Sequence, residues 1–327
     1  MNTLSIIIVN YRAWRRLSQC LDALAGFSGD KLEKEVIIVD NFSDDGQLTL
    51  FADKYPKFRF ILNSGNNGFS DGCNKGAEAA GGSYFLFLNP DTIASEESLI
   101  ALLSFAEQFP EAIVSCGQIN DKGEKGIPYG RFPALGRITG LLRFLNRIFS
   151  GKEYTEMQDK TLPYISVDWV SGSVVLLSKE QFSKLGGWDT GFWMYYEDVD
   201  LCRRLKNGEG KVLIHSHITI VHNHGGASRI NPAIASLTKC EVHISRHFYI
   251  SCHEKGLNGF LMHLVLIISN LIFGLIPVLV SLPFIFFFPK LKVQAIVYLK
   301  LMKYYLSAVF RGSWISPRSV KSCKSTT

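Results

Sequence analysis

The stretch LSIIIVN, residues 4–10, decides the fold. It is an almost unbroken run of apolar, mostly β-branched residues, as expected for a strand that a parallel sheet buries on both faces. The run EVIIVD, residues 35–40, has the same character. Apolar residues between the two runs recur at helical spacing, at Leu17, Cys20, Leu21 and Leu24. The first 40 residues therefore predict strand, helix, strand.

The pattern continues along the chain. FRFIL (58–62) and SYFLFLN (83–89) predict two more strands, with a helix over about residues 69–80 between them. Further strands are expected near residues 172–178 and 211–221. This alternation predicts an α/β fold, a mostly parallel Rossmann-like sheet with helices on both faces.

Polar residues follow each of the first four strands. They are Asn10-Tyr11, Asp40-Asn41, Asn63 with the loop after it, and Asn89-Pro90-Asp91. Ligands of such sheets bind beyond the carboxyl ends of the strands. We therefore expect the functional site at this edge.

The charge of the chain is divided unevenly. Residues 1–254 hold 26 Lys and Arg against 29 Asp and Glu, whereas residues 255–327 hold nine basic residues and no acidic one. The basic end suggests an anionic membrane surface, and no nucleic-acid-binding motif accompanies it. The seven cysteines form no CxxC pair, which is typical of a reducing compartment, and the first residues do not resemble a signal peptide.

The last quarter predicts membrane association. Residues 256–289 contain no formal charge, and the apolar part would exceed the bilayer core as one straight helix. We expect a broken helix or hairpin, kinked near Pro277, that enters the bilayer and returns, followed by an interfacial helix. The predicted domains are a catalytic domain, 1–235, and a membrane-associating helical region, 236–327. A helix over 137–149 is open to two interpretations, surface packing or membrane contact.

The stretch WMYYEDVDLCRRL, residues 193–205, crowds three carboxylates behind large aromatics. Asp198 either is the N-cap of a helix or serves in chemistry, and its apolar and acidic neighbours raise the cost of ionising it. The first interpretation leaves Glu197 and the aromatics unexplained. Asp200 is expected to pair with Arg204 one helical turn later.

Five segments carry a resemblance to a known family: SIIIVNY, VIIVDNFSDDG, NSGNNGFSDGCNKG, YFLFLNPDT and GGWDTGFWMYYEDVDLCRRL. In this order and spacing they resemble the family-two glycosyltransferases with the GT-A fold, in particular the rhamnosyltransferase-like branch. The resemblance covers about residues 3–230. It implies an inverting transfer of a sugar from a nucleotide-sugar to an acceptor hydroxyl.

The resemblance implies residues for the nucleotide-sugar. Asp40 would read the uracil or thymine ring; its structural alternative is to stabilise its own turn. The glycine-rich loop would lie against the nucleotide and sugar, and the alternative for its glycines is helix packing on the sheet. The implied nucleotide-sugar contacts are Asn10, Tyr11, Asp40, Asn67, Gly68, Asn74, Asn89 and Asp91.

Relatives carry a DxD metal motif where this chain has LNPDT. Asn89 stands at the first acidic position, so Asp91 is the only acidic residue of the motif in this chain. Oxygen ligands suit Mg²⁺ or Mn²⁺, which would neutralise the departing diphosphate. A His in IVHNHGGAS, residues 220–228, would complete the site. His222 is preferred, and His224 stays possible because the spacing does not decide.

The resemblance assigns Asp198 as catalytic base and Glu197 as its partner on the acceptor side. Trp169, Gly172, Trp188 and Asp189 would shape the acceptor side. The expected donor is a dTDP- or UDP-sugar. Rhamnose is favoured, with galactose, glucose and N-acetylglucosamine open. The expected acceptor is a lipid-linked saccharide at the cytoplasmic face of the bacterial inner membrane, used in cell-surface polysaccharide synthesis.

Two other functions are compatible with the sequence. A sugar-phosphate nucleotidyltransferase shares this type of nucleotide binding, although its usual glycine-rich N-terminal signature is missing. A non-catalytic, membrane-attached saccharide-binding subunit is the alternative from another class.

Overall fold

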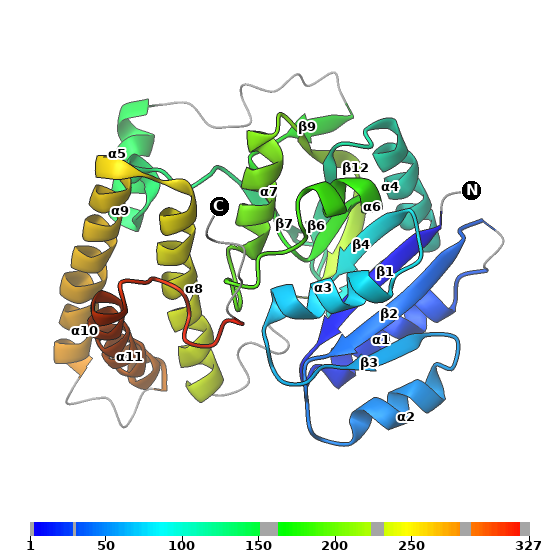
Figure 1. Ribbon diagram of the computed structural model, residues 1–327, viewed down its shortest axis with the longest axis horizontal. Coiled ribbons are helices and arrows are strands. Elements are labelled where there is room, and N and C mark those ends of the chain that lie inside the picture. Colours follow the sequence, from blue (N-terminus) through cyan, green and yellow to red (C-terminus); the bar gives the residue numbers. More distant parts are fainter. Residues whose placement is uncertain (1–2, 29–30, 151–162, 224–231, 282–288, 321–327) are drawn as a thin grey trace. The chain divides into compact units, whose positions relative to one another are not determined.

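The computed structural model describes residues 3–28, 31–150, 163–223, 232–281 and 289–320 (Figure 1). The chain forms two compact units. Unit 1 comprises Met1–Phe132, Gln158–Thr190 and Glu197–Ala227. Unit 2 comprises Pro133–Met157, Gly191–Tyr196 and Ser228–Thr327.

Unit 1 is built on a mixed sheet, as the alternating pattern predicts. Its first half consists of β1 (Leu4–Asn10), α1 (Trp14–Ala25), β2 (Lys34–Asp40), α2 (Gln47–Lys54), β3 (Arg59–Leu62), α3 (Phe69–Ala79) and β4 (Tyr84–Leu88). The strands β3, β2, β1 and β4 lie side by side and are parallel. The α/β prediction is confirmed here, strand by strand.

The second half extends this sheet. It consists of β5 (Thr92–Ile93), α4 (Glu96–Gln108), β6 (Ile113–Ile119), β7 (Lys125–Gly126), β8 (Tyr129–Gly130), β9 (Tyr164–Ser166), β10 (Trp169–Val170), β11 (Val174–Ser178), α6 (Lys179–Lys184), α7 (Glu197–Asn207) and β12 (Val212–His222). The order continues β4-β11-β6-β12-β5. The strand β11 runs antiparallel to both neighbours, so it delivers its first residues to the same edge at which β4 ends.

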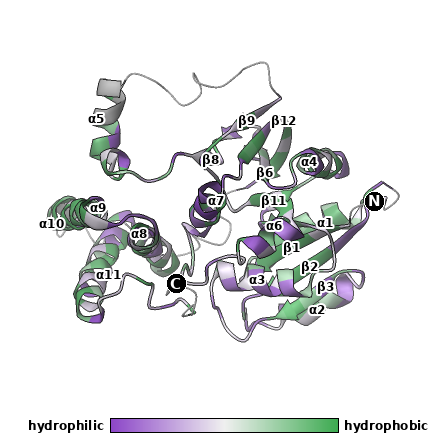
Figure 2. Ribbon diagram, turned by 45° about the horizontal axis from the view of Figure 1, so that its top comes forward, coloured by the Kyte–Doolittle hydropathy of each residue, from purple (hydrophilic) through white to green (hydrophobic). Residues whose placement is uncertain are grey.

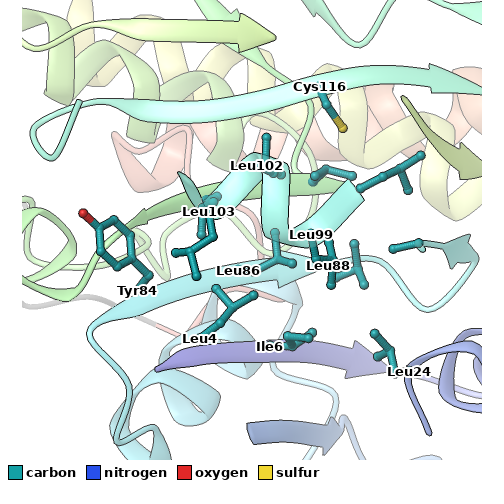
Figure 3. Close-up of a cluster of buried hydrophobic side chains, with 14 of the residues drawn as sticks. Leu4, Ile6, Leu24, Tyr84, Leu86, Leu88, Leu99, Leu102, Leu103 and Cys116 are labelled. Carbon is teal, nitrogen blue, oxygen red and sulfur yellow. The ribbon is translucent and has the colours of Figure 1, made fainter. Parts of the chain in front are cut away.

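The two faces of β1 are covered by different helices. Leu4, Ile6 and Ile8 belong to a buried cluster with residues of α1 and α4, shown in Figure 3. The residues between them face α3 through its glycines. A Cβ on Gly76 would lie 2.3 Å from Ile7 Cγ2, and one on Gly72 would lie 2.7 Å from Val9 Cγ1. The smooth glycine face predicted from the sequence therefore serves close helix–sheet packing.

Unit 2 is helical. It contains η1 (Leu135–Arg137), α5 (Gly140–Ser150), α8 (Pro232–His253), α9 (Gly256–Ile268), the π-helical turn η3 (Ser269–Phe273), α10 (Gly274–Ser281) and α11 (Pro289–Arg311). The helix α11 packs against α8 and α10. Figure 2 colours much of α9 and α10 green, the colour of hydrophobic residues.

The apolar segment does not break at Pro277. The helix α10 continues through that residue, and the irregularity lies one turn earlier, in η3. A proline has no N–H to offer the carbonyl four residues before it, and a π-helical turn absorbs this mismatch. The irregular turn in the described residues thus lies just before Pro277 rather than at it, and the hairpin stays a prediction. Among those residues, one helix, Gly256–Ile276, is long and apolar enough to cross a membrane.

We predict that Gly76→Ala destabilises unit 1 by about 1–3 kcal/mol, because the added methyl group overlaps Ile7 across the helix–sheet contact. The midpoint of urea unfolding measures this change. Gly26→Ala is the control, because the nearest neighbour of its Cβ lies at an ordinary 3.5 Å. Equal midpoints for the two variants would contradict the close packing.

Candidate active site

The carboxyl ends of the parallel strands gather polar residues, as the sequence predicts. The register pairs Asn10, the last residue of β1, with Asp40, the last residue of β2. Asn63 follows β3, and its N–H donates to the carbonyl of Asp40 at 2.9 Å. The polar strand ends therefore form one connected edge.

Asp40 is held by its own turn. Its Oδ1 accepts hydrogen bonds from Asn10 Nδ2 at 2.8 Å and from Ser43 Oγ at 2.5 Å, and its Oδ2 accepts one from Ser43 N at 2.8 Å. The residue is 1% exposed. The turn-stabilising role considered from the sequence is therefore present, and the nucleotide contact stays a prediction. Ser43 was missed, although a side-chain acceptor three residues before a Ser is a common turn signal.

The loop between β3 and α3 ends on a glycine in a backbone conformation that other residues rarely adopt. Gly68 precedes α3 with φ of +96°, and its carbonyl accepts a bond from Asn41 Nδ2 at 2.8 Å. Asn67 lies partly exposed beside it, and Tyr11, 37% exposed, lies under the guanidinium of Arg12. The predicted nucleotide contacts of these residues are not tested by the geometry.

Asn74 is engaged with backbone. Its Nδ2 donates to the carbonyl of Trp188 at 2.8 Å and its Oδ1 accepts from the N–H of Trp188 at 2.9 Å. The buried Trp188 ring packs edge-on against Phe69 and Phe87. Asn74 and Trp188, both predicted as site residues, thus bind one another and hold the segment around Trp188 against α3. Its neighbour Asp189 lies partly buried.

Trp169, also expected on the acceptor side, lies in β10. Its indole covers Gly130, where a Cβ would lie 2.7 Å from the ring, and its Nε1 donates to the carbonyl of Arg131 at 2.9 Å. The indole is therefore part of the β8–β10 ribbon, and a contact with the acceptor stays a prediction.

Asp91 and His222 meet across two antiparallel strands. The register pairs His222 with Thr92, so the residue beside Thr92 approaches the imidazole. His222 Nε2 lies 3.2 Å from Asp91 Oδ1, and the imidazole is 4% exposed. Asn89, two residues before Asp91, is held separately: its N–H donates to the carbonyl of Ser173 at 3.0 Å. His224, the other candidate, lies outside the described residues.

The hydrogen-bond network orients the imidazole. Gln118 Nε2 donates to Ser173 Oγ at 2.7 Å, so Gln118 Oε1 faces His222 Nδ1, also at 2.7 Å. Nδ1 therefore carries a proton, and Nε2 points at the carboxylate. His222 Nε2 and Asp91 Oδ1 are both electron-rich, so they lie this close only when a proton or a cation is between them. Metal-bound histidines commonly have such a second hydrogen bond.

A carboxylate oxygen and an imidazole nitrogen are suitable ligands for Mn²⁺ and usable by Mg²⁺. Among the described parts of the chain, no group of three or more His, Cys, Asp or Glu side chains assembles as a metal site. A cation held by Asp91 and His222 thus needs further ligands, which diphosphate oxygens and water can supply.

Asp198 is fixed by two backbone donors. Its Oδ2 accepts the N–H of Gly172 at 2.9 Å, and its Oδ1 accepts the N–H of Val199 at 2.8 Å. The helix α7 already begins at Glu197, so the N-cap interpretation is wrong. The predicted pair of Asp200 with Arg204 is confirmed, with 2.7 Å between Oδ2 and Nη2.

The two neighbouring carboxyl groups have different environments. Burial raises the pKa of Asp198, while the bonds from Gly172 and Val199 lower it. The pKa of Glu197 is raised well above its usual range, first by burial and then by the charge of Asp198. Glu197 Oε2 is buried and has no hydrogen-bond partner among the described residues. The uncharged form of Glu197 is therefore favoured.

One short loop joins the two halves of the site. Gly172 donates to Asp198, and the next residue, Ser173, holds both Asn89 and the Gln118 that orients His222. Asp198 and the Asp91–His222 pair are thus linked through two consecutive residues, Gly172 and Ser173. Ser173 and Gln118 were not found from the sequence, because only the β11–β6–β12 pairing brings them to this edge.

Two family models match the chain. Residues 5–169, half of its length, match glycosyl transferase family 2. Residues 154–224 match the model described as the N-terminal domain of galactosyltransferase.

Curated relatives share the same region. The chain is 28% identical over 248 residues to an N-acetylglucosaminyl-diphospho-decaprenol L-rhamnosyltransferase of Mycobacterium tuberculosis, covering 71% of this chain and 80% of the relative. It is 27% identical over 231 residues to a low-salt glycan biosynthesis hexosyltransferase of Haloferax volcanii, covering 68% of each.

A solved structure shows the same fold. It is a mannosyltransferase from Pyrobaculum calidifontis in complex with GDP-mannose and Mn²⁺, with a TM-score of 0.52 at 14% identity over 94% of this chain and 81% of that one. The family-model match and this GT-A-like architecture lead to one assignment: the chain belongs to glycosyl transferase family 2.

Proposed function

We propose that this glycosyltransferase moves a sugar, with rhamnose favoured, from a dTDP- or UDP-sugar to a hydroxyl of a lipid-linked saccharide, with inversion at the anomeric carbon. The carrying observation is the loop through Gly172 and Ser173, which holds Asp198 on one side and the groups around Asp91 and His222 on the other. The name of the mycobacterial relative supports the choice of sugar and acceptor. The hexosyltransferase relative keeps other hexoses possible.

Asp91 and His222 would hold the divalent cation. The cation, when bound, neutralises the charge of the departing diphosphate. The chain contributes the orientation of the ligands, because Gln118 keeps the proton of His222 on Nδ1 and directs Nε2 toward Asp91. The Mn²⁺ in the structurally similar mannosyltransferase supports a cation of this type.

Asp198 would act as the base. Its carboxylate takes the proton of the acceptor hydroxyl, whose oxygen attacks the anomeric carbon as the bond to the diphosphate oxygen breaks on the opposite face. The hydrogen bonds from Gly172 and Val199 fix the direction of the carboxylate, and burial raises its pKa toward a more basic value. Glu197, uncharged beside it, avoids a second negative charge on the acceptor side.

Unit 2 would attach the enzyme to the cytoplasmic face of the inner membrane. Its described part exposes large apolar side chains on several helices: Leu141 and Phe144 of α5, Leu257, Phe260, Leu264, Ile268, Ile272, Phe273, Leu275, Ile276 and Leu279 from α9 to α10, and Leu299, Leu306, Val309 and Phe310 of α11. Lys292, Lys303 and Arg311 are exposed on α11. Apolar and basic side chains together suit an anionic lipid surface. In this proposal residues 1–235 are the catalytic domain and 236–327 the membrane-associating region.

We predict that Asp198→Asn lowers the transfer rate by about 10²–10⁴-fold, because the amide cannot take the acceptor proton. The measurement is release of nucleoside diphosphate together with sugar transfer to a lipid-linked acceptor, for dTDP-rhamnose and a panel of UDP-sugars. Asp53→Asn, an exposed carboxylate on α2, is the control. A rate for Asp198→Asn within threefold of the unsubstituted enzyme would remove Asp198 as the base.

We predict that His222→Asn weakens Mn²⁺ binding at least tenfold, on the order of the loss seen when a metal-site partner is removed. Asn retains a partner for Gln118 but lacks Nε2. The readout is the rise in Tm on titrating Mn²⁺ in the presence of UDP or dTDP. His217→Asn, an exposed His on the same strand, should behave like the unsubstituted chain. An equal response of the two variants would exclude His222 as a ligand.

We predict a pH-dependent gain in stability for Glu197→Gln. The pKa of Glu197 is higher in the folded state than in the unfolded chain, so its stabilising contribution is present at low pH and is lost as pH rises through the folded value. Gln stays uncharged throughout. The Tm difference between variant and unsubstituted chain should therefore grow from near pH 5 to pH 8.5, reaching at least roughly 2 °C.

Glu180→Gln is the matched control, because Glu180 is an exposed carboxylate on α6. Its Tm difference should not change with pH in this way. A constant difference for Glu197→Gln over the same range would show that Glu197 does not hold its proton more tightly in the folded state.

A further inference from the structure

The residues Gly191–Tyr196, here called the aromatic loop, directly precede Glu197 and Asp198 in the chain. The aromatic loop groups with the helices of unit 2, whereas Glu197 begins a segment of unit 1. The peptide that leads into the proposed base is therefore held by the helical unit. The contacts that hold it lie mainly on α8.

The first half of the aromatic loop is anchored by packing and by the C-terminal segment. The buried ring of Phe192 contacts Phe248 of α8, with 4.7 Å between centroids. The guanidinium of Arg318 lies 5.6 Å from the centroid of the Trp193 ring. Ser319 Oγ donates to the carbonyl of Gly191. These contacts fix where the loop begins.

The second half is anchored by two neighbouring residues of α8. Ser245 Oγ donates to the carbonyl of Met194 at 2.8 Å. Arg246 Nε donates to the hydroxyl of Tyr196 at 2.8 Å, and the same guanidinium lies 5.7 Å from the centroid of the Tyr196 ring. Tyr249, one turn further on α8, packs near this ring, with 5.7 Å between the two ring centroids. Arg246 and Tyr249 thus both hold Tyr196 within unit 2.

The backbone of the aromatic loop needs such anchors. Tyr195 and Tyr196 have φ of +70° and +68°, in the left-handed region that favours glycine. Two consecutive bulky residues adopt this region only when surrounding contacts impose it. In the described chain these contacts come from α8 and hold Tyr196, the second residue before Asp198.

We propose that Arg246 is a positioning residue for the transfer reaction, acting through Tyr196 on the orientation of Asp198. This inference rests on the proposed role of Asp198 as base. When the bond from Arg246 is lost, Tyr195 and Tyr196 can relax toward negative φ. The start of α7 then turns, and the Asp198 carboxylate leaves the direction set by Gly172.

The expected effect is on the chemical step. A small displacement of a catalytic group can cost up to about 10²-fold in rate. Arg246→Met and Tyr196→Phe should therefore lower kcat by roughly 10–100-fold. The KM for the nucleotide-sugar should stay unchanged, because its proposed contacts lie on the strand ends and loops of unit 1.

The test is a double-mutant cycle on the full chain. The variants are Arg246→Met, Tyr196→Phe and the double substitution, with kcat, the KM for the nucleotide-sugar and Tm measured for each. If Arg246 acts through Tyr196, the double variant loses no more kcat than the stronger single variant. Lys239→Met, an exposed cation on the same helix, is the control and should retain full kcat.

Two results would overturn the inference: kcat unchanged in Tyr196→Phe, or losses that multiply in the double variant. A fall in Tm with unchanged kcat would also assign Arg246 to stability alone. Asp198→Asn, measured in parallel, separates this failure from failure of the proposed function. An inactive Asp198→Asn beside a fully active Tyr196→Phe rejects only the positioning role, whereas an active Asp198→Asn rejects the base itself.

Discussion

The hydrogen bonds of two consecutive residues, Gly172 and Ser173, connect the parts of the candidate site. The N–H of Gly172 binds the carboxylate of Asp198, and Ser173 binds both Asn89 and the Gln118 that orients His222. This arrangement requires β11 to run antiparallel between β4 and β6, so that its start lies beside the end of β4. A parallel strand at the same place would deliver its last residues there instead.

Burying a carboxylate costs free energy, and the buried carboxyl groups of this site differ in the hydrogen-bond donors around them. Asp40 accepts hydrogen bonds from three donors, supplied by Asn10 and Ser43. Glu197 has a buried oxygen with no such donor in the described part of the chain, and burial raises its pKa. Neighbouring Asp198 lies between these extremes, with burial opposed by two backbone donors. The three carboxyl groups thus lie in different environments.

The helical unit has a composition unlike that of the sheet. It combines exposed apolar stripes on α9, α10 and α11 with basic residues, and it also binds the aromatic loop before Asp198. Attachment to a membrane and control of the base would then reside in the same set of helices. The physical link is the chain itself, because the two left-handed tyrosines directly precede Glu197, the first residue of α7.

Local pattern determined the elements of unit 1. The apolar runs at residues 4–10 and 35–40, and the helical spacing of Leu17, Cys20, Leu21 and Leu24, each predict an element that the structure contains, with those four residues buried. The same pattern located the polar strand ends, and motif resemblance supplied the family. Sequence placed an irregularity near Pro277, and the structure has it in η3, because a π-helical turn can absorb a missing donor without ending a helix.

Only the tertiary structure decided which partners each site residue has. The pairing of Asp91 with His222 depends on the register between β5 and β12, and Gln118 and Ser173 come from strands distant in sequence. Asn74 and Trp188 proved to bind one another. Sequence periodicity reports which face of an element is buried, since that depends on near neighbours. It does not report which distant strand lies alongside, because pairing across a sheet is set by the packing of the whole chain.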